Sequence, residues 1–434
     1  MPRNPHTEVA AALPPSTDAA PDPQSRVFWL IAASVFLIEF LLTAHNQVFG
    51  LHGPDTYWAL HWTRDYSHGF VRRALLGQML HWVHLDNTNY LVILVLSWAI
   101  SLLLLILIVQ SVRRLSAGLC PYERISFAVA LLLCPLMGGI VIGSTGDPLQ
   151  LILAIYLLLL RFVIEPARQP VATGAVFVLF GVAASLIHEA SLFFIAPALV
   201  VAAFVLFRNR TARAALIGYL LGATPVIVAI VLTNSQLISQ DYVFQLHFHS
   251  TIVSTPGSQG FESFSVLFHE ENADRFGRGL RGYLAMGTNA VGDSLLPVFF
   301  ASLIFTVFFS PKDSTPATRR RVLFTFLLPF LLSTPLYVIA HDWGRFLAYA
   351  FIPAVAGLAG WRIPHTIKPD EGRQAVFGLG LLLSGITTTS LLQGYGVRGL
   401  EANHRVLVCS ILVLAAAAYL LRRVSTENLG KQAT

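Results

Sequence analysis

The chain has 434 residues, of which 55% are hydrophobic and 12% charged, and its formal net charge is +6. Soluble domains contain about 25% charged residues, so this composition excludes an ordinary soluble protein. Three scattered cysteines exclude a disulfide framework and a structural zinc site. The basic residues lie in short segments between apolar runs, where they orient membrane proteins, and they do not indicate a nucleic-acid partner.

Apolar runs long enough to cross a membrane divide the chain into predicted spans. Residues 1–26 are rich in Pro, Ala, Asp and Thr and predict a disordered cytoplasmic tail. Residues 27–49 are too long for the apolar region of a signal peptide and predict an uncleaved signal anchor. Eleven further spans are predicted at residues 90–112, 125–142, 149–165, 171–187, 190–207, 214–233, 294–310, 322–340, 347–361, 375–392 and 405–421. We therefore predict an all-α, polytopic membrane helical bundle of about 12 transmembrane helices over residues 27–422, followed by a cytoplasmic tail, 423–434.

The distribution of Lys and Arg predicts the orientation of this bundle. Twelve spans place both termini on one side of the membrane. With the termini in the cytoplasm, 20 of the basic residues lie in inner segments and nine in outer segments, which satisfies the positive-inside rule. The two long loops, residues 50–89 after span one and 234–292 after span seven, then lie outside.

The first outer loop carries acidic and basic residues that topology does not require. Arg72 and Arg73 depart from the positive-inside trend, and Asp55 and Asp65 precede them. One interpretation is a solvated loop with an interfacial helix, because apolar residues recur at helical spacing at Leu75, Leu76, Met79, Leu80 and Val83. The other is that the arginines hold an anion such as a lipid pyrophosphate, with a carboxylate as general base.

Two short outer hairpins add further ionisable groups. Asp147 precedes Pro148 at a predicted helix start, where a side-chain cap explains it without any function. His188 and Glu189 lie between two apolar runs, and ionisable groups at that depth are costly unless they are paired or face a wet cavity. A mutual salt bridge and a place in a catalytic cavity are both open for this pair.

Arginine and histidine also occur in the remaining outer segments. Asp342 and Arg345 lie three residues apart in the turn between spans nine and ten, where they can pair with each other or bind a headgroup or sugar. In the loop of residues 234–292, Arg275, Arg278 and Arg281 repeat every three residues, so a helix here would have one cationic face able to clamp phosphate. That loop has no clearly spaced set of metal ligands.

The overall arrangement resembles the GT-C superfamily of polyprenyl-phosphate-dependent membrane glycosyltransferases. The shared features are many spans, a long polar outer loop with an interfacial helix directly after span one, acidic residues in that loop, and a second large outer loop. The outer arginines are similar to those of bacterial polysaccharide polymerases and O-antigen ligases. The resemblance implies a catalytic acid soon after span one, to which Asp55 or Asp65 would correspond. It also implies residues that bind pyrophosphate, for which the comparable types here are Arg72, Arg73, Arg345 and His188 or His341.

We therefore predict a multi-pass glycosyltransferase or polysaccharide polymerase of the bacterial inner membrane. Its donor would be a polyprenyl-linked sugar or oligosaccharide presented at the outer face, beside membrane lipid and other polysaccharide-assembly proteins, and no cofactor is expected. Asp65 is the leading catalytic base and Asp55 its rival. The predicted substrate-binding residues are His68, Arg72, Arg73, Asp147, His188, Glu189, Arg275, Arg278, His341, Asp342 and Arg345, and no metal site is predicted.

Two other function classes stay open. The isolated carboxylate of Glu39 within span one favours a multi-pass transporter or lipid-linked-glycan flippase, because such a group is a candidate for proton coupling. A membrane acyltransferase with His188 and Glu189 as its base is the third class. The clustering of charges at one face, rather than near the bilayer midplane, favours the transferase.

Overall fold

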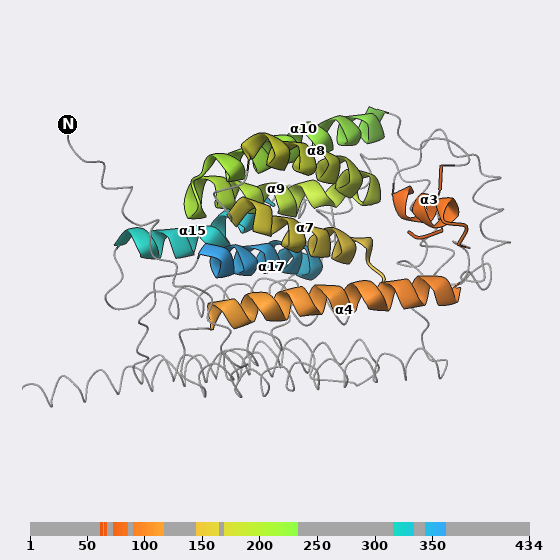
Figure 1. Ribbon diagram of the computed structural model, residues 1–434, viewed down its shortest axis with the longest axis horizontal. Coiled ribbons are helices and arrows are strands. Elements are labelled where there is room, and N and C mark those ends of the chain that lie inside the picture. Colours follow the sequence, from red (N-terminus) through yellow and green to blue (C-terminus); the bar gives the residue numbers. More distant parts are fainter. Residues whose placement is uncertain are drawn as a thin grey trace, which may run out of the picture.

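The computed structural model describes residues 61–63, 65–66, 73–85, 90–116, 145–164, 169–232, 316–333 and 343–361. Over these residues the fold is all-α, as the sequence predicts (Figure 1). In chain order the helices are α3 (Leu75–Trp82), α4 (Tyr90–Leu115), α7 (Pro148–Ile164), α8 (Pro170–Ile187), the 3₁₀ turn η3 (Glu189–Ser191), α9 (Leu192–Val200), the π-helical segment η4 (Val201–Leu206), α10 (Arg210–Leu232), α15 (Pro316–Leu332) and α17 (Trp343–Trp361).

Four segments in the described part are long and apolar enough to cross a membrane: Leu91–Leu115, Pro170–Ile187, Glu189–Leu206 and Arg210–Leu232. They agree with four predicted spans to within a few residues. The shorter apolar helices Pro148–Ile164 and Tyr349–Trp361 lie at two more predicted spans. The predicted spans that fall outside the described residues are 27–49, 125–142, 294–310, 375–392 and 405–421.

Helix α15 begins before the span predicted at residues 322–340. Its first turns contain Arg319, Arg320 and Arg321. Arginine is a good helix former, so the helix extends through a basic segment that a hydropathy criterion leaves out. The apolar criterion therefore detects only the later part of this helix.

Proline and asparagine define several helix starts. Pro148, Pro170 and Pro316 each begin a helix, a position at which the missing backbone N–H costs nothing. The side chain of Asn209 accepts a hydrogen bond from the backbone N–H of Ala212 at 2.7 Å and so caps α10. Its amide also donates to the carbonyl of Val163 at 3.2 Å, which ties the start of α10 to the end of α7.

Glycines allow helices α8 and α10 to pack with their backbones in contact. A Cβ atom on Gly181 would lie 2.4 Å from the carbonyl oxygen of Tyr219, and one on Gly222 would lie 2.1 Å from that of Val178. Gly218 and Gly222 are four residues apart and face α8 together, the spacing of close helix pairs in membranes. This pair forms one outer layer of the bundle (Figure 1).

Helix α17 lies at the centre of the described helices and contacts α4, α7, α9 and α15 (Figure 1). Its buried residues include Ala354, Val355 and Leu358. The ring of Tyr349 stacks on that of Phe194 in α9, with centroids 5.6 Å apart. Small and aromatic side chains thus fill the space between α17 and its neighbours.

Large apolar side chains cover the outward faces of α4, α8 and α10. Leu91, Leu179 and Leu221 are each more than 60% exposed. Exposed leucines in such number are unfavourable in water but favourable against acyl chains. The outward faces therefore suit a lipid environment.

The bundle has two chemically different ends. One end is rich in arginine, and we call it the basic end; its arginines are Arg113, Arg114, Arg161, Arg208, Arg210, Arg213, Arg320 and Arg321. Here Arg161 of α7 contacts α4, and the guanidinium of Arg321 lies 5.6 Å from the ring centroid of Trp361, where α17 ends. These contacts join α7 to α4 and α15 to α17 at ends that the sequence predicts on the same side of the membrane. They agree with spans that run alternately in opposite directions across the membrane. The opposite end carries the candidate site, and α3 lies beside it (Figure 1).

Candidate functional site

Polar side chains from separate parts of the chain meet at the opposite end of the bundle. They come from the segments before α3, from the start of α7, from the junction of α8 and η3, and from the second turn of α17. We call this group the polar cluster, and its members are His61, Trp62, Arg73, Asp147, His188, Glu189 and Tyr349.

Arg73 and Glu189 form the charged contact of the cluster. The Nε of Arg73 donates to both carboxylate oxygens of Glu189, at 3.1 and 2.9 Å, and Nη2 donates to Oε1. The side chain of Arg73 is 9% exposed and that of Glu189 is 24% exposed. A guanidinium and a carboxylate matched in this way orient each other, so the pair fixes the segment before α3 against the start of η3.

The backbone of Arg73 is in the left-handed region, with φ at 61°. For a residue with a side chain this conformation costs about 1–2 kcal/mol, which the surrounding structure has to offset. Strain of this kind concentrates at functional sites. His84 and Arg208, outside the cluster, share this conformation, so the strain supports Arg73 as a candidate only together with its burial and its ion pair.

His188 lies between two of these contacts. Its Nδ1 accepts a hydrogen bond from the backbone N–H of Ala190 at 3.2 Å, so in the neutral ring the proton is on Nε2. The same Nδ1 lies 3.9 Å from Oε2 of Glu189. The contact between His188 and Glu189 is therefore longer than the contact between Arg73 and Glu189, which is 2.9 Å from Nε to Oε2. Arg73 is the close partner of Glu189.

A second histidine faces His188. The ring centroids of His61 and His188 are 5.8 Å apart, with an angle of 43° between the ring planes. Both side chains are buried. Two buried imidazoles thus lie next to a carboxylate and a guanidinium.

Asp147 caps α7, as its place before Pro148 predicts. Its Oδ1 accepts from the backbone N–H of Leu149 at 2.9 Å, and its Oδ2 accepts from the hydroxyl of Tyr349 at 2.7 Å. The residue is 1% exposed. The carboxylate therefore holds the start of α7 against α17.

The segments before α3 are fastened to the bundle by hydrogen bonds. The indole N–H of Trp62 donates to the carbonyl of Gly146 at 2.9 Å, and the backbone N–H of Tyr66 donates to the side chain of Gln78 in α3 at 2.8 Å. Burial raises the pKa of Tyr66 to about 12, so its hydroxyl stays protonated at physiological pH and is not a general base. Asp65, half-buried, precedes Tyr66 and is held near α3 by the same contact.

The structure brings together four of the residues that the sequence analysis selected: Arg73, Asp147, His188 and Glu189. Asp65 lies in the neighbouring described segment, and Arg345 lies in the first turn of α17. The other selected residues lie outside the described residues; they are Asp55, His68, Arg72, Arg275, Arg278, His341 and Asp342.

Sequence reasoning did not select His61, Trp62 or Tyr349. The first two stand in the same predicted outer loop as Asp65, where an uncharged histidine and a tryptophan give a weaker signal than a charged side chain. Tyr349 lies within an apolar run, and only its distance of about two helical turns from Asp342 places it near the same membrane face. Its role depends on a contact with Asp147, which is 202 residues away in the chain.

The cluster combines positive charge, negative charge and imidazole at one edge of the bundle. Glu189, half-buried, is more exposed than Arg73, and both histidines are buried. Among the described residues, no group of three or more His, Cys, Asp or Glu is placed to hold a metal ion.

A family described as uncharacterised membrane protein Rv1490 matches residues 28–249 of this sequence. The chain belongs to this family. The match includes helices α3 to α10 and six of the seven members of the polar cluster, and Tyr349 lies beyond it. Membership, together with the apolar helices, establishes a multi-pass membrane protein. No curated protein and no solved structure matches the chain.

Proposed function

We propose that the protein is a glycosyltransferase or polysaccharide polymerase that uses a polyprenyl-phosphate-linked or polyprenyl-pyrophosphate-linked sugar at the outer face of a bacterial inner membrane. The observation that carries the proposal is the meeting of Arg73, Glu189, His188 and His61 at the edge of an apolar bundle. A lipid-linked donor has its phosphate at this depth, where a guanidinium is an effective ligand.

The proposed reaction assigns roles to some of the residues in the cluster and next to it in the sequence. The acceptor hydroxyl oxygen bonds to the anomeric carbon of the donor sugar while the bond from that carbon to the donor phosphate oxygen breaks. The phosphate leaves with the electron pair, and Arg73 with Arg72 stabilises its charge. Asp65 takes the proton of the acceptor hydroxyl. Glu189 holds the guanidinium of Arg73 in place, and Asp147 acts as a positioning residue through α7 and Tyr349.

The proposal includes an orientation: about twelve spans, with both termini and the basic end in the cytoplasm. The arginines of the basic end support it through the positive-inside rule. The orientation is testable with single cysteines in a chain whose native cysteines are replaced by serine. His81→Cys is exposed at the opposite end and Arg210→Cys at the basic end. A membrane-impermeant maleimide added to intact cells should label the first and not the second, and the reverse pattern would overturn the orientation.

The test of function is a profile of lipid-linked glycans, extracted from cells with and without the gene and measured by mass spectrometry. Loss of the gene should cause a polyprenyl-linked sugar or oligosaccharide to accumulate, and its mass identifies the missing step. Complementation with wild type should remove the accumulated species, whereas Asp65→Asn and Arg73→Ala should not, at equal protein levels in the membrane. Asp86→Asn is the matched control, because it removes an acid from the same predicted loop outside the proposed site. An unchanged profile would overturn the transferase in favour of a transporter, and Glu39→Gln would then be the first variant to examine.

A further inference from the structure

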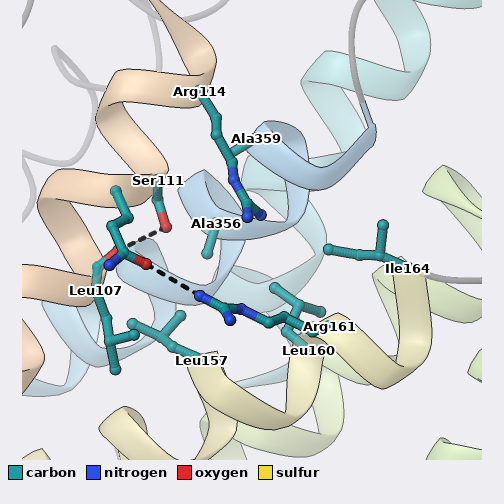
Figure 2. A pocket seen from close by; sticks show the side chains of 10 residues that line it. Leu107, Ser111, Arg114, Leu157, Leu160, Arg161, Ile164, Ala356 and Ala359 are labelled. Atoms are coloured by element: carbon teal, nitrogen blue, oxygen red, sulfur yellow. Dashed lines mark hydrogen bonds between the residues drawn. The ribbon is translucent and has the colours of Figure 1, made fainter. Parts of the chain in front are cut away.

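A small pocket lies at the basic end, away from the polar cluster and between α4, α7 and α17 (Figure 2). Its volume is about 20 Å³, enough for about one water molecule or one phosphate oxygen, so a phosphate group can only lie at its mouth and a nucleotide cannot be enclosed. Four polar side chains line it: Gln110, Ser111, Arg114 and Arg161. The rest of the wall is leucine, isoleucine and alanine.

The two arginines come from different helices and reach into the same pocket (Figure 2). Arg114 lies in the last turn of α4 and Arg161 in the last turn of α7. The Nη2 of Arg161 donates to Oε1 of Gln110 at 3.1 Å, which fixes the direction of the guanidinium. A guanidinium has five N–H donors, so this contact leaves most of them to meet a further acceptor.

The charge of the pocket points to an anion. Among the described residues the lining contains no acidic side chain. Arginine near a helix C-terminus is favourable by itself because of the helix dipole and the positive-inside rule. Neither effect requires two guanidinium groups on facing helices to share one pocket with a glutamine and a serine.

The apolar walls distinguish a lipid from a free ion. Leu107, Leu157 and Ile164 line the pocket beside the polar groups, and the outward face of α4, the helix that carries Leu107, suits a lipid environment. A lipid presents a phosphate next to glycerol and acyl chains, so it can contact both kinds of surface at once. Basic pockets between transmembrane helices on the cytoplasmic side are a known form of headgroup site.

We propose that this pocket binds the phosphate group of an anionic membrane phospholipid, with Arg114 and Arg161 as its ligands. Gln110 is a positioning residue that orients Arg161. The inference does not depend on the proposed glycosyl transfer, because it concerns the other end of the bundle and is tested without activity.

The experiment measures binding of phosphatidylglycerol to the purified full chain in detergent, by native mass spectrometry and by the thermal midpoint from tryptophan fluorescence. Phosphatidylcholine and inorganic phosphate are the comparison ligands. Arg114→Gln and Arg161→Gln should each weaken phosphatidylglycerol binding about tenfold or more, the usual effect of losing one charge-assisted contact. Arg113→Gln is the matched control: it removes the same charge from the adjacent position, which is exposed like Arg114 and Arg161 but does not line the pocket. It should leave binding within about twofold of wild type.

Each outcome decides the proposal. Preference of the wild type for phosphatidylglycerol, lost in both pocket variants and retained in Arg113→Gln, supports it. Equal loss in all three variants means that net charge at the basic end attracts the lipid and overturns the specific site. Stabilisation by inorganic phosphate alone assigns the pocket to a free anion and overturns the lipid. If the glutamine variants do not fold, equal binding of phosphatidylglycerol and phosphatidylcholine to the wild type is sufficient to overturn the proposal.

Discussion

The close contact between α8 and α10 gives the most direct test of the fold. We consider the substitution Gly222→Ala, which adds one methyl group. Its Cβ would lie 2.1 Å from the carbonyl oxygen of Val178 and 3.0 Å from the backbone nitrogen of Val182. Neither neighbour is the end of a flexible side chain, so the methyl group fits only if the helices move apart.

The size of the effect follows from two opposing contributions. Real Cβ atoms essentially never approach other atoms more closely than 3.0 Å, so the contact must open by about 0.9 Å. Such overpacking typically costs about 1–3 kcal/mol. Alanine in a helix interior is favoured over glycine by about 0.5–1 kcal/mol, which offsets part of this cost. The net expectation is a destabilisation of about 1–2 kcal/mol.

The assay is the thermal midpoint of the detergent-purified protein, followed by tryptophan fluorescence, with size-exclusion chromatography to confirm a single species. The matched control is Gly174→Ala in the same helix pair, whose Cβ would lie 3.5 Å from the carbonyl oxygen of Ala214, an ordinary contact. Gly222→Ala should lower the midpoint by several degrees, whereas Gly174→Ala should leave it unchanged or raise it. If both variants behave like the control, the backbones of α8 and α10 do not approach as closely as described.

Three further predictions concern the opposite end of the bundle. Tyr349→Phe removes the hydroxyl that donates to buried Asp147 and should cost about 1–3 kcal/mol, measured as a lower thermal midpoint; an unchanged midpoint would mean that another donor replaces it. Gly146→Ala should cost about 1–2 kcal/mol in the same assay, because Gly146 has φ at 95°, and a stable alanine variant would contradict that backbone conformation. Arg73→Glu and Glu189→Arg should each reduce stability by about 3 kcal/mol, and the double exchange should recover part of the loss; strictly additive effects would show that the two side chains are not coupled.

The sequence predicted the apolar helices well because their cause is local. A membrane-spanning helix is defined by a run of apolar residues, and α8, the segment from η3 to η4, and α10 follow that rule closely. The closeness of α8 and α10 was not predicted, although Gly218 and Gly222 stand at the spacing that allows it. Which helix faces such a glycine pair is a non-local property, and a single sequence does not contain it.

The candidate site was predictable in its residue types and less so in its pairing. Arg73 was selected because its charge departs from the positive-inside trend, and Glu189 because it lies between two apolar runs. Nothing in the sequence indicates that the two side chains contact each other. His61 and Tyr349 were missed because an uncharged side chain in a loop or an apolar run carries no comparable signal. The sequence thus identifies charged groups whose position is energetically unfavourable unless they have a partner. Which residue is that partner depends on tertiary contacts.

The two ends of the bundle use arginine in different ways, and this difference supports a functional site at Arg73. At the basic end, Arg113, Arg208 and Arg210 are exposed, and the positive-inside rule accounts for their presence. Arg73 is buried and paired with a carboxylate, at the end of the bundle opposite to these arginines. A buried ion pair adds little net stability compared with apolar residues of similar size, because desolvation of the charges offsets their attraction. Apolar packing would stabilise this position at least as well, and this is our reason for proposing a functional role for the pair of Arg73 and Glu189.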